Sequence, residues 1–285
     1  MNPQKTIIMA DSGCDVNKVY RDQYGIRLLP FHVYYPEKDY LDSVDIDPMM
    51  IYKRFPDEFP STSTPSMAEI SDALDQAVAE GYENAIIVCI SHCFSGTYNA
   101  VRLIGTQRDD IHVYAFDTLN ISVSSGLYAI WAARKLEEGW SAEKIAEELP
   151  KKLPEGNIFF YMDTLKYLQR GGRIGRLSGM VGSILKIKPV ISCDSEGAYY
   201  TVGMIRGERQ SKKKLMESVV KFTGDAKAII CVEEGGGNHL EALEFESMLR
   251  TNLPQCEFIR EQQITASLAI NTGPGLIGVG VLKNP

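Results

Sequence analysis

The chain of 285 residues is 44% hydrophobic and 24% charged and carries a formal net charge of −7, a composition that fits a soluble globular protein and excludes a disordered chain. The excess of negative charge disfavours nucleic acid as a partner, because a surface that follows the phosphate backbone needs excess positive charge. No apolar run approaches the ~18 residues of a membrane span, and the first apolar run is too short for a signal peptide, so we expect a cytoplasmic protein without an integral membrane segment.

The N-terminal part alternates between predicted strands and predicted helices. Strands are expected at residues 6–10, 26–35, 85–90, 111–116 and 157–162, and helices at residues 15–24, from 48, from 67, from 97, around 127–136 and at 141–149. This alternation predicts a parallel sheet with right-handed crossovers. Pro30 interrupts the second strand, which fits an edge or a bend.

A candidate anion site follows the strand at 85–90. Ser95, Gly96 and Thr97 come where a helix begins. Small hydroxyl residues and a glycine let backbone amides approach a ligand, and the unpaired amides together with the helix dipole favour an anion. The same residues also fit an ordinary strand-to-helix turn that a serine caps.

A second hydroxyl cluster lies at residues 61–66, with the sequence STSTPS. Ser66 and Glu69 form a capping box for the following helix. One cap needs one hydroxyl, so the other four are available either for a ligand or simply as polar loop residues.

The sign of the charge reverses between residues 164 and 189. Glycines at 171, 172, 175, 179 and 182 accompany the cations and fit a lid or connector, but they form neither GxGxxG nor a Walker A loop. Arginines in such a segment can also clamp a phosphate. The segment contains no acid and six cations, Lys166, Arg170, Arg173, Arg176, Lys186 and Lys188.

The C-terminal part has a different order of predicted elements. Strands at 188–193 and 198–205 form a hairpin, helices lie at 211–222 and 239–253, and further strands lie at 226–232 and 256–262. A flexible loop is expected at 234–238, and the turn at 272–275 leads into a last strand at 277–282. The chain is therefore predicted to be α/β, with an N-terminal parallel-sheet α/β domain at 1–160 and a C-terminal α+β domain at 161–285.

The sequence offers no convincing catalytic group. Nucleophilic catalysis would need Ser95 or Cys93 beside a histidine that an acid orients, but His92 is too near in sequence to be an obvious base, and the GxSxG elbow is absent. Six scattered cysteines without a CxxC pair indicate reduced thiols, and no metal site is predicted. Hydroxyls and amides that hold an anion remain, so binding without a cofactor is the simpler interpretation.

The order and spacing of several short motifs over the whole chain resemble the DegV family of bacterial fatty-acid-binding proteins. These motifs are Asp11-Ser12 with Asp15, Thr62-Ser63-Thr64-Pro65-Ser66, Ser95-Gly96-Thr97-Tyr98, Asp117-Thr118, Arg170-Gly171-Gly172-Arg173-Ile174, Ile187-Lys188-Pro189 and Thr272-Gly273-Pro274-Gly275.

The resemblance implies a long-chain fatty acid bound in a pocket between the two domains. Thr62, Ser95 and Gly96 would then bind its carboxylate. The chain departs from the family at Thr64, where Gln is usual, and at Asn271, near the head group, where His usually precedes the TGPG turn.

The resemblance also implies a partner and a place in phospholipid metabolism. A separate ATP-dependent fatty acid kinase would receive the bound acid, and Arg170, Arg173 and Arg206 match the parts associated with docking or transfer. The alternative hypothesis is an enzyme acting on a phosphorylated small molecule, with the arginine-rich segment around the phosphate.

Overall fold

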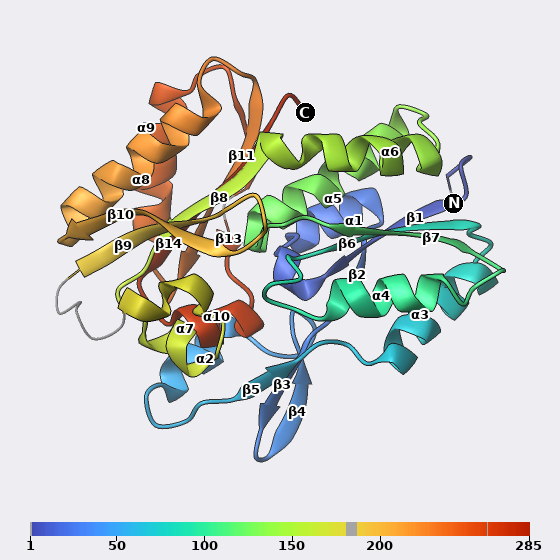
Figure 1. The fold of residues 1–285 in the computed structure, drawn as a ribbon, viewed down its shortest axis with the longest axis horizontal. Coiled ribbons are helices and arrows are strands. Elements are labelled where there is room, and N and C mark those ends of the chain that lie inside the picture. Colours follow the sequence, from blue (N-terminus) through green and yellow to red (C-terminus); the bar gives the residue numbers. More distant parts are fainter. Residues whose placement is uncertain (1, 181–186, 261) are drawn as a thin grey trace.

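Two β-sheets form the frame of the molecule, with helices on their faces (Figure 1). The computed structural model describes residues 2–180, 187–260 and 262–285. The first sheet is parallel throughout and has the order β2-β1-β6-β7, as the alternating pattern predicts. Its strands are β1 (Thr6–Asp11), β2 (Arg27–Leu29), β6 (Asn84–Cys89) and β7 (His112–Asp117).

Two groups of helices cover this first sheet. One face packs against α3 (Met67–Ala79) and α4 (Thr97–Gly105) through a cluster that includes Leu74, Ile87 and Val101. The other face packs against α5 (Ser122–Glu137), and α6 (Ala142–Lys152) follows it. Helix α1 (Lys18–Tyr24) contacts α5, as the short 3-10 segment η1 (Ser12–Cys14) does.

Helix α5 connects the two sheets. It contacts β1 and β6 of the first sheet and also β8 and β14 of the second. It is apolar or small on nearly every side, and its large residues Leu127, Tyr128 and Trp131 are buried. A helix that is covered all round is expected to lack a polar face.

The second sheet has the order β10-β9-β8-β14-β11-β12, with β13 also paired to β11. Neighbours are antiparallel except that β11 pairs in parallel with β12 and β13. The predicted hairpin is confirmed as β9 and β10. The strands are β8 (Gly156–Tyr161), β9 (Ile187–Cys193), β10 (Tyr199–Arg206), β11 (Ala228–Gly235), β12 (Glu257–Phe258), β13 (Gln262–Gln263) and β14 (Leu276–Lys283).

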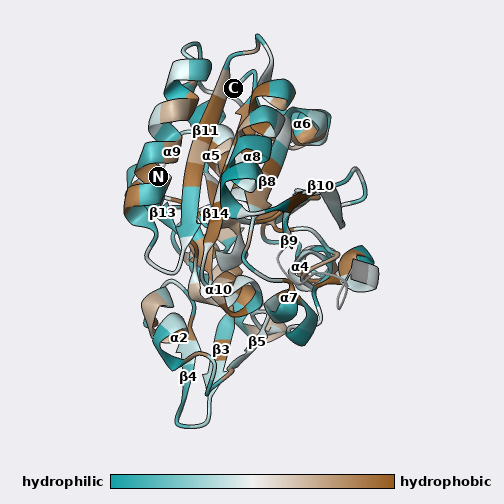
Figure 2. Ribbon diagram, turned by 90° about the vertical axis from the view of Figure 1, so that its left-hand side faces the viewer, coloured by the Kyte–Doolittle hydropathy of each residue, from teal (hydrophilic) through white to brown (hydrophobic). Residues whose placement is uncertain are grey.

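Helices α8 (Glu208–Thr223) and α9 (His239–Asn252) cover the outer face of this sheet. Figure 2 shows β14 as a mostly hydrophobic strand among more hydrophilic helices. The short 3-10 segment η2 (Leu153–Glu155) precedes β8. The strand predicted at 157–162 as part of the N-terminal parallel pattern is β8, which lies in this second sheet between antiparallel neighbours, so that placement is wrong. The predicted domain boundary at residue 160 falls inside β8, and the division into two domains stays a prediction.

A small third sheet, β4-β3-β5, projects from the rest of the molecule (Figure 1). It consists of β3 (His32–Tyr35), β4 (Lys38–Leu41) and β5 (Ser61–Ser63), and α2 (Pro48–Arg54) lies between β4 and β5 in the chain. The single strand predicted at 26–35 is wrong, since β2 and β3 belong to different sheets. Proline lacks the N–H that a strand ladder needs, so Pro30 separates them.

Three further segments complete the fold, α7 (Lys166–Arg170), the 3-10 segment η3 (Gly175–Met180) and α10 (Ala266–Thr272). Helix α10 contacts α2, α7 and β3. The short helical piece predicted in the cation-rich segment is confirmed as α7, while residues 181–186 of that segment lie outside the described residues.

Several element boundaries differ from the prediction, and the strand expected at 256–262 is two short strands, β12 and β13. Helix α6 runs through Pro150 to Lys152 rather than ending at Pro150. Strand β11 reaches Gly235, and the buried Glu234 carboxylate accepts hydrogen bonds from the N–H groups of Gly237 (2.9 Å) and Asn238 (2.8 Å). The loop predicted to be flexible is therefore held by this side chain. No helix among the described residues is long and apolar enough to cross a membrane.

Candidate functional site

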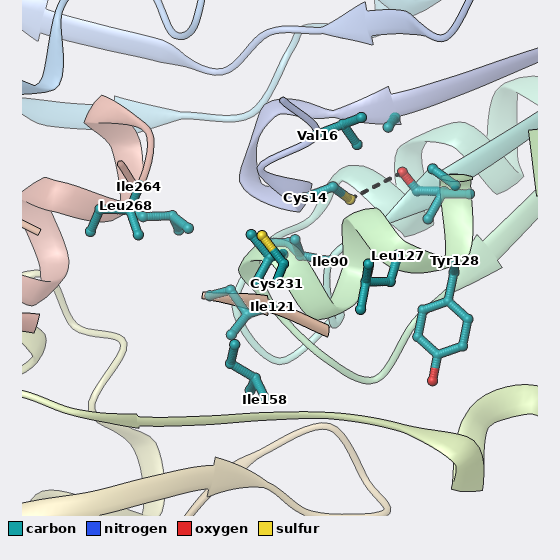
Figure 3. Close-up of a cluster of buried hydrophobic side chains, with 14 of the residues drawn as sticks. Cys14, Val16, Ile90, Ile121, Leu127, Tyr128, Ile158, Cys231, Ile264 and Leu268 are labelled. Atoms are coloured by element: carbon teal, nitrogen blue, oxygen red, sulfur yellow. Dashed lines mark hydrogen bonds between the residues drawn. The ribbon is translucent and has the colours of Figure 1, made fainter. Parts of the chain in front are cut away.

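A cavity of about 260 Å³ lies where the two sheets meet. Ile90 and Ile121 come from loops that follow strands of the first sheet, whereas Ile158 and Phe160 come from β8 of the second. Figure 3 shows Ile121 and Ile158 pointing toward one another, with Ile264 and Leu268 to one side. The apolar lining residues are Phe31, Ile90, Phe94, Ile121, Ile158, Phe160, Tyr199, Ile264, Leu268 and Leu276.

Polar residues surround one part of this cavity, which we call the mouth. They come from β5, from the segment between β6 and α4, from the segment after α7, and from α10. All of them are exposed or half-buried except Ser95, which is buried. The mouth consists of Thr62, Ser63, Thr64, His92, Cys93, Ser95, Gly96, Arg173 and Asn271.

The mouth brings together the three residues predicted to bind a carboxylate. Ser95 Oγ accepts a hydrogen bond from the N–H of Thr97 (3.3 Å) and lies 2.8 Å from Thr97 Oγ1, so it caps the first turn of α4. Among the hydrogen bonds of the described residues, none involves the Gly96 N–H or the Thr62 hydroxyl. A Cβ placed on Gly96 would meet nothing within 4 Å. The amide and the two hydroxyls can therefore face an anion.

Two more predicted residues also lie at the mouth. Asn271 Nδ2 donates to the Ser267 carbonyl (2.9 Å) within α10, and Arg173 Nη1 donates to the Gly171 carbonyl (2.6 Å). A Cβ on Gly171 would lie 1.9 Å from Asn271 Oδ1. Glycine at position 171 thus lets the segment after α7 approach α10 closely.

The structure does not place Arg170 and Arg206 among the residues that line the cavity. The Arg170 guanidinium lies 3.4 Å from the centre of the Phe59 ring, a cation–π contact beside the mouth. Arg206 ends β10 and is exposed. The roles predicted for these site residues stay predictions.

A second polar group faces the cavity from its buried side. Ser122 Oγ lies between the carboxyl groups of Asp15 and Glu233, within hydrogen-bonding distance of both. We call these two carboxyl groups the acid pair; their residues are 4% and 2% exposed, respectively. Ser122 and Glu233 line the cavity.

Burial controls the protonation of the acid pair. It raises the pKa of Glu233 to about 7, and it raises the pKa of Asp15 well above its usual range, with the neighbouring Glu233 raising it further. A serine hydroxyl carries one proton and can donate it to one carboxylate only. Ser122 Oγ is therefore hydrogen-bonded to Asp15 and Glu233 at the same time when one carboxylate accepts the serine proton and the other carboxyl group is protonated and donates to Ser122 Oγ.

Asp11 and Asp15, which the sequence indicated only as parts of a family motif, both connect distant segments. Asp11 accepts from the N–H of Ile90 (3.0 Å), and Asp15 accepts from the N–H of Thr265 (3.0 Å). Burial raises the pKa of Asp11 to about 7. These contacts fix the loops that line the cavity.

A third group at the mouth was not predicted. His92 Nδ1 lies 2.7 Å from Asp117 Oδ2, and His92 Nε2 lies 3.7 Å from Cys93 Sγ. Sequence reasoning rejected His92 because it is adjacent to Cys93 in the chain. Asp117 ends β7 beside the end of β6, and that neighbouring position in a parallel sheet was the available indication. The described residues contain no group of three or more His, Cys, Asp or Glu that could hold a metal.

Comparison with known proteins places the chain among close relatives. A family model described as "Uncharacterised protein, DegV family" matches residues 5–284. A DegV domain-containing protein of Clostridium perfringens is 35% identical, and one of Clostridium acetobutylicum is 34% identical; each match covers 98% of this chain and 99% of the relative.

Two solved structures have the same fold over essentially their whole length. DegV from Bacillus subtilis, described as a fatty acid binding protein, is 26% identical with a TM-score of 0.89 and covers 100% of both chains. A DegV family protein from Thermus thermophilus, described by its fatty acid binding, is 26% identical with a TM-score of 0.90 and covers 99% of this chain and 100% of its own.

Proposed function

The chain belongs to the DegV family, and we propose that it binds a long-chain fatty acid in the cavity and presents the carboxylate at the mouth to a separate ATP-dependent fatty acid kinase. The observation that carries this proposal is the position of the unpaired Thr62 hydroxyl of β5 and the unpaired Gly96 amide at the start of α4, together at one part of an apolar cavity. The fatty-acid-binding relatives of the same fold support it.

The apolar walls suit an alkyl chain. Burying a methylene group contributes about 0.8 kcal/mol, so a C16-like tail gains on the order of 10 kcal/mol before the losses of tail and overall freedom. A phosphorylated metabolite, which the alternative enzyme hypothesis requires, would find its donors at the mouth, where Arg173 lies, and would leave these apolar walls without an apolar partner.

The mouth suits the carboxylate. We assign Thr62, Ser95 and Gly96 to it, since the Thr62 hydroxyl on β5 and the Ser95 hydroxyl and Gly96 amide at the N-terminus of α4 can supply hydrogen bonds to an anion. The acid pair disfavours a carboxylate on the buried side, because it supplies neither a cation nor an amide donor there and burial penalises an ionised group. Thr64 also lines the mouth, so its replacement of the family's usual Gln affects a residue near the head group.

The exposed arginines suit a docking surface for the kinase. Arg173 at the mouth and Arg170 beside it would face an incoming partner, and Arg206 on β10 would extend this surface. A cytoplasmic location fits the proposal, because the free thiol of Cys93 at the mouth persists in a reducing compartment.

Native mass spectrometry of protein purified from a bacterial host tests this function. We expect one long-chain fatty acid per chain, identified by extraction, and uptake of added palmitate by delipidated protein. A preparation with no lipid and no uptake of palmitate would refute the proposal, and a bound phosphorylated metabolite would favour the enzyme hypothesis.

A further inference from the structure

Two side chains of the mouth, His92 and Cys93, form a chain of contacts with Asp117 at the end of β7, which fatty acid binding does not require. Asp117 Oδ2 lies 2.7 Å from His92 Nδ1, and His92 Nε2 lies 3.7 Å from Cys93 Sγ. The second Asp117 oxygen, Oδ1, accepts from the N–H of Leu119 (3.0 Å), so the carboxylate is fixed in orientation. His92 and Cys93 are exposed and line the cavity.

This arrangement can activate a thiol. When His92 Nδ1 donates to Asp117, the other ring nitrogen, Nε2, is the acceptor that faces the thiol. The sulfur–nitrogen distance is long for a proton transfer, but such contacts commonly shorten when a substrate is bound. The Cys93 thiol donates a weak hydrogen bond to the Glu196 carbonyl (3.5 Å), and this contact is lost when the thiol is deprotonated.

The position of Cys93 distinguishes it from the other thiols. Among the six cysteines, all of which the structure describes, Cys93 is exposed, Cys256 is half-buried and the remaining four are buried. Burial raises the pKa of the Cys14, Cys89 and Cys193 thiols, which disfavours their thiolates.

The carbonyl group of a bound acyl chain would lie close to this thiol. Cys93 precedes Ser95 and Gly96 by two and three positions, and all three line the mouth. The donors that hold a carboxylate would equally hold the carbonyl oxygen of an activated acyl group, and the Gly96 amide would stabilise the negative charge that develops on it.

We propose that Cys93 is a nucleophile that accepts the long-chain acyl group of an acyl phosphate bound in the cavity and forms a thioester. The proposal rests on the proposed function, which supplies the acyl phosphate. His92 Nε2 takes the proton of the thiol, and the sulfur attacks the carbonyl carbon to form the C–S bond. The C–O bond to phosphate breaks, and phosphate leaves with the electron pair and the proton from His92. Asp117 is a positioning residue that holds the imidazole.

The test uses the delipidated full chain with synthetic palmitoyl phosphate, followed by intact mass measurement. We expect one palmitoyl adduct on the wild type, its removal by neutral hydroxylamine, its absence from Cys93→Ser and Cys93→Ala, and its retention in the matched control Cys256→Ala. Asp117→Asn should slow acylation by about a hundredfold and change its pH profile, since an unfixed imidazole is a poorer base.

Palmitate binding is measured for every variant to separate the two proposals. A wild type that binds palmitate but forms no adduct overturns the role of Cys93 and leaves the proposed function standing, whereas a wild type that does not bind palmitate refutes the proposed function. Equal adduct on Cys93→Ala also overturns the inference. Acylation of Asp117→Asn at the wild-type rate and with the wild-type pH profile overturns the role of Asp117.

Discussion

The two polar regions of the cavity, the mouth and the acid pair, have opposite chemistry. The mouth offers hydroxyl and amide donors at the start of α4, whereas Asp15 and Glu233 offer carboxyl groups that share one serine hydroxyl. In the proposed function, the donors of the mouth hold the carboxylate, whereas the acid pair offers it neither a cation nor an amide donor. In the proposed function, the carboxylate of a bound fatty acid would therefore point to the mouth, and its alkyl chain would lie along the apolar walls.

The first and largest effect is expected on stability, at the acid pair. A carboxyl group whose pKa is raised on folding binds its proton more tightly in the folded chain than in the unfolded chain. Its contribution to the free energy of unfolding is therefore fully present below the unfolded pKa and is lost as pH rises through the folded pKa. For Glu233 the pH interval of this loss runs from 4.5, the ordinary pKa, to about 7, the pKa in the folded chain. The loss approaches roughly 3 kcal/mol at most.

The Glu233→Gln variant tests this pH-dependent loss of stability, because glutamine does not titrate. The free energy of unfolding, measured by urea denaturation from pH 4.5 to 7.5, should fall with pH more steeply for the wild type than for the variant. The neighbouring phenols of Tyr52 and Tyr199, whose pKa values burial raises, stay neutral over this range. Glu244→Gln on the exposed face of α9 is the control and should follow the wild type. Parallel curves for wild type and Glu233→Gln would contradict the prediction.

The second effect concerns binding at the mouth. Thr62→Val keeps the branched shape on β5 but removes the hydroxyl, and a hydrogen bond to a charged group contributes about 1.5 to 3 kcal/mol. Palmitate affinity should therefore fall by about 10- to 150-fold in a fluorescence or calorimetric titration. Ser61→Ala, on the same strand but exposed and outside the cavity lining, should bind like the wild type. Unchanged affinity in Thr62→Val would place the head group elsewhere.

The third effect concerns transfer rather than binding. Arg170→Ala should leave palmitate affinity close to the wild type and lower the rate of acyl phosphate formation with the kinase by about fivefold, the size of an exposed charge contact. The deficit should shrink as salt rises, because screening weakens the wild-type contact. Arg209→Ala on the exposed face of α8 serves as the control for general charge. A normal rate in Arg170→Ala would indicate that Arg170 only packs on Phe59.

The smallest effect is expected at Asn271. Asn271→His should change palmitate affinity by less than about tenfold, or ~1.4 kcal/mol, because the proposed function assigns the carboxylate contacts to Thr62, Ser95 and Gly96. Kinase-dependent phosphorylation should rise near pH 6, where an imidazolium stabilises developing negative charge better than a neutral amide. Titration of palmitate and turnover assays from pH 6 to 8 check this. A large gain in affinity without a change in turnover would instead assign residue 271 to binding.

Local patterns predicted the elements that carry strong local chemistry. The helix start predicted at residue 48, which is α2, and the capping box of Ser66 and Glu69 at α3 are confirmed. Helix α10 was not predicted, because its seven residues are too few to show a helical pattern and lead directly into the turn at 272–275. Its stability comes from contacts with α2 and α7, which no local pattern shows.

The site was predictable only where its residues lie next to one another in the sequence. The pattern around Ser95 and Gly96 predicted a helix start that can bind an anion, and the family resemblance added Thr62. The acid pair could not be found, because Asp15, Ser122 and Glu233 come from segments far apart in the chain and meet only in the folded protein. The same holds for the pairing of His92 with Asp117 across two neighbouring strand ends.

Strand β14 has a consequence for how the chain acquires its cavity. It follows β8 and β11 in the sequence, yet it lies between them in the sheet, so the two halves of that sheet stay unconnected until residues 276–283 insert. Pairing across such a long stretch of chain is slow, because the loop entropy is lost before contacts compensate it. Leu276 at the start of β14 also lines the cavity. We therefore expect a refolding chain to begin taking up lipid only when β14 has paired with β8 and β11, so the time course of lipid uptake reports the insertion of this strand.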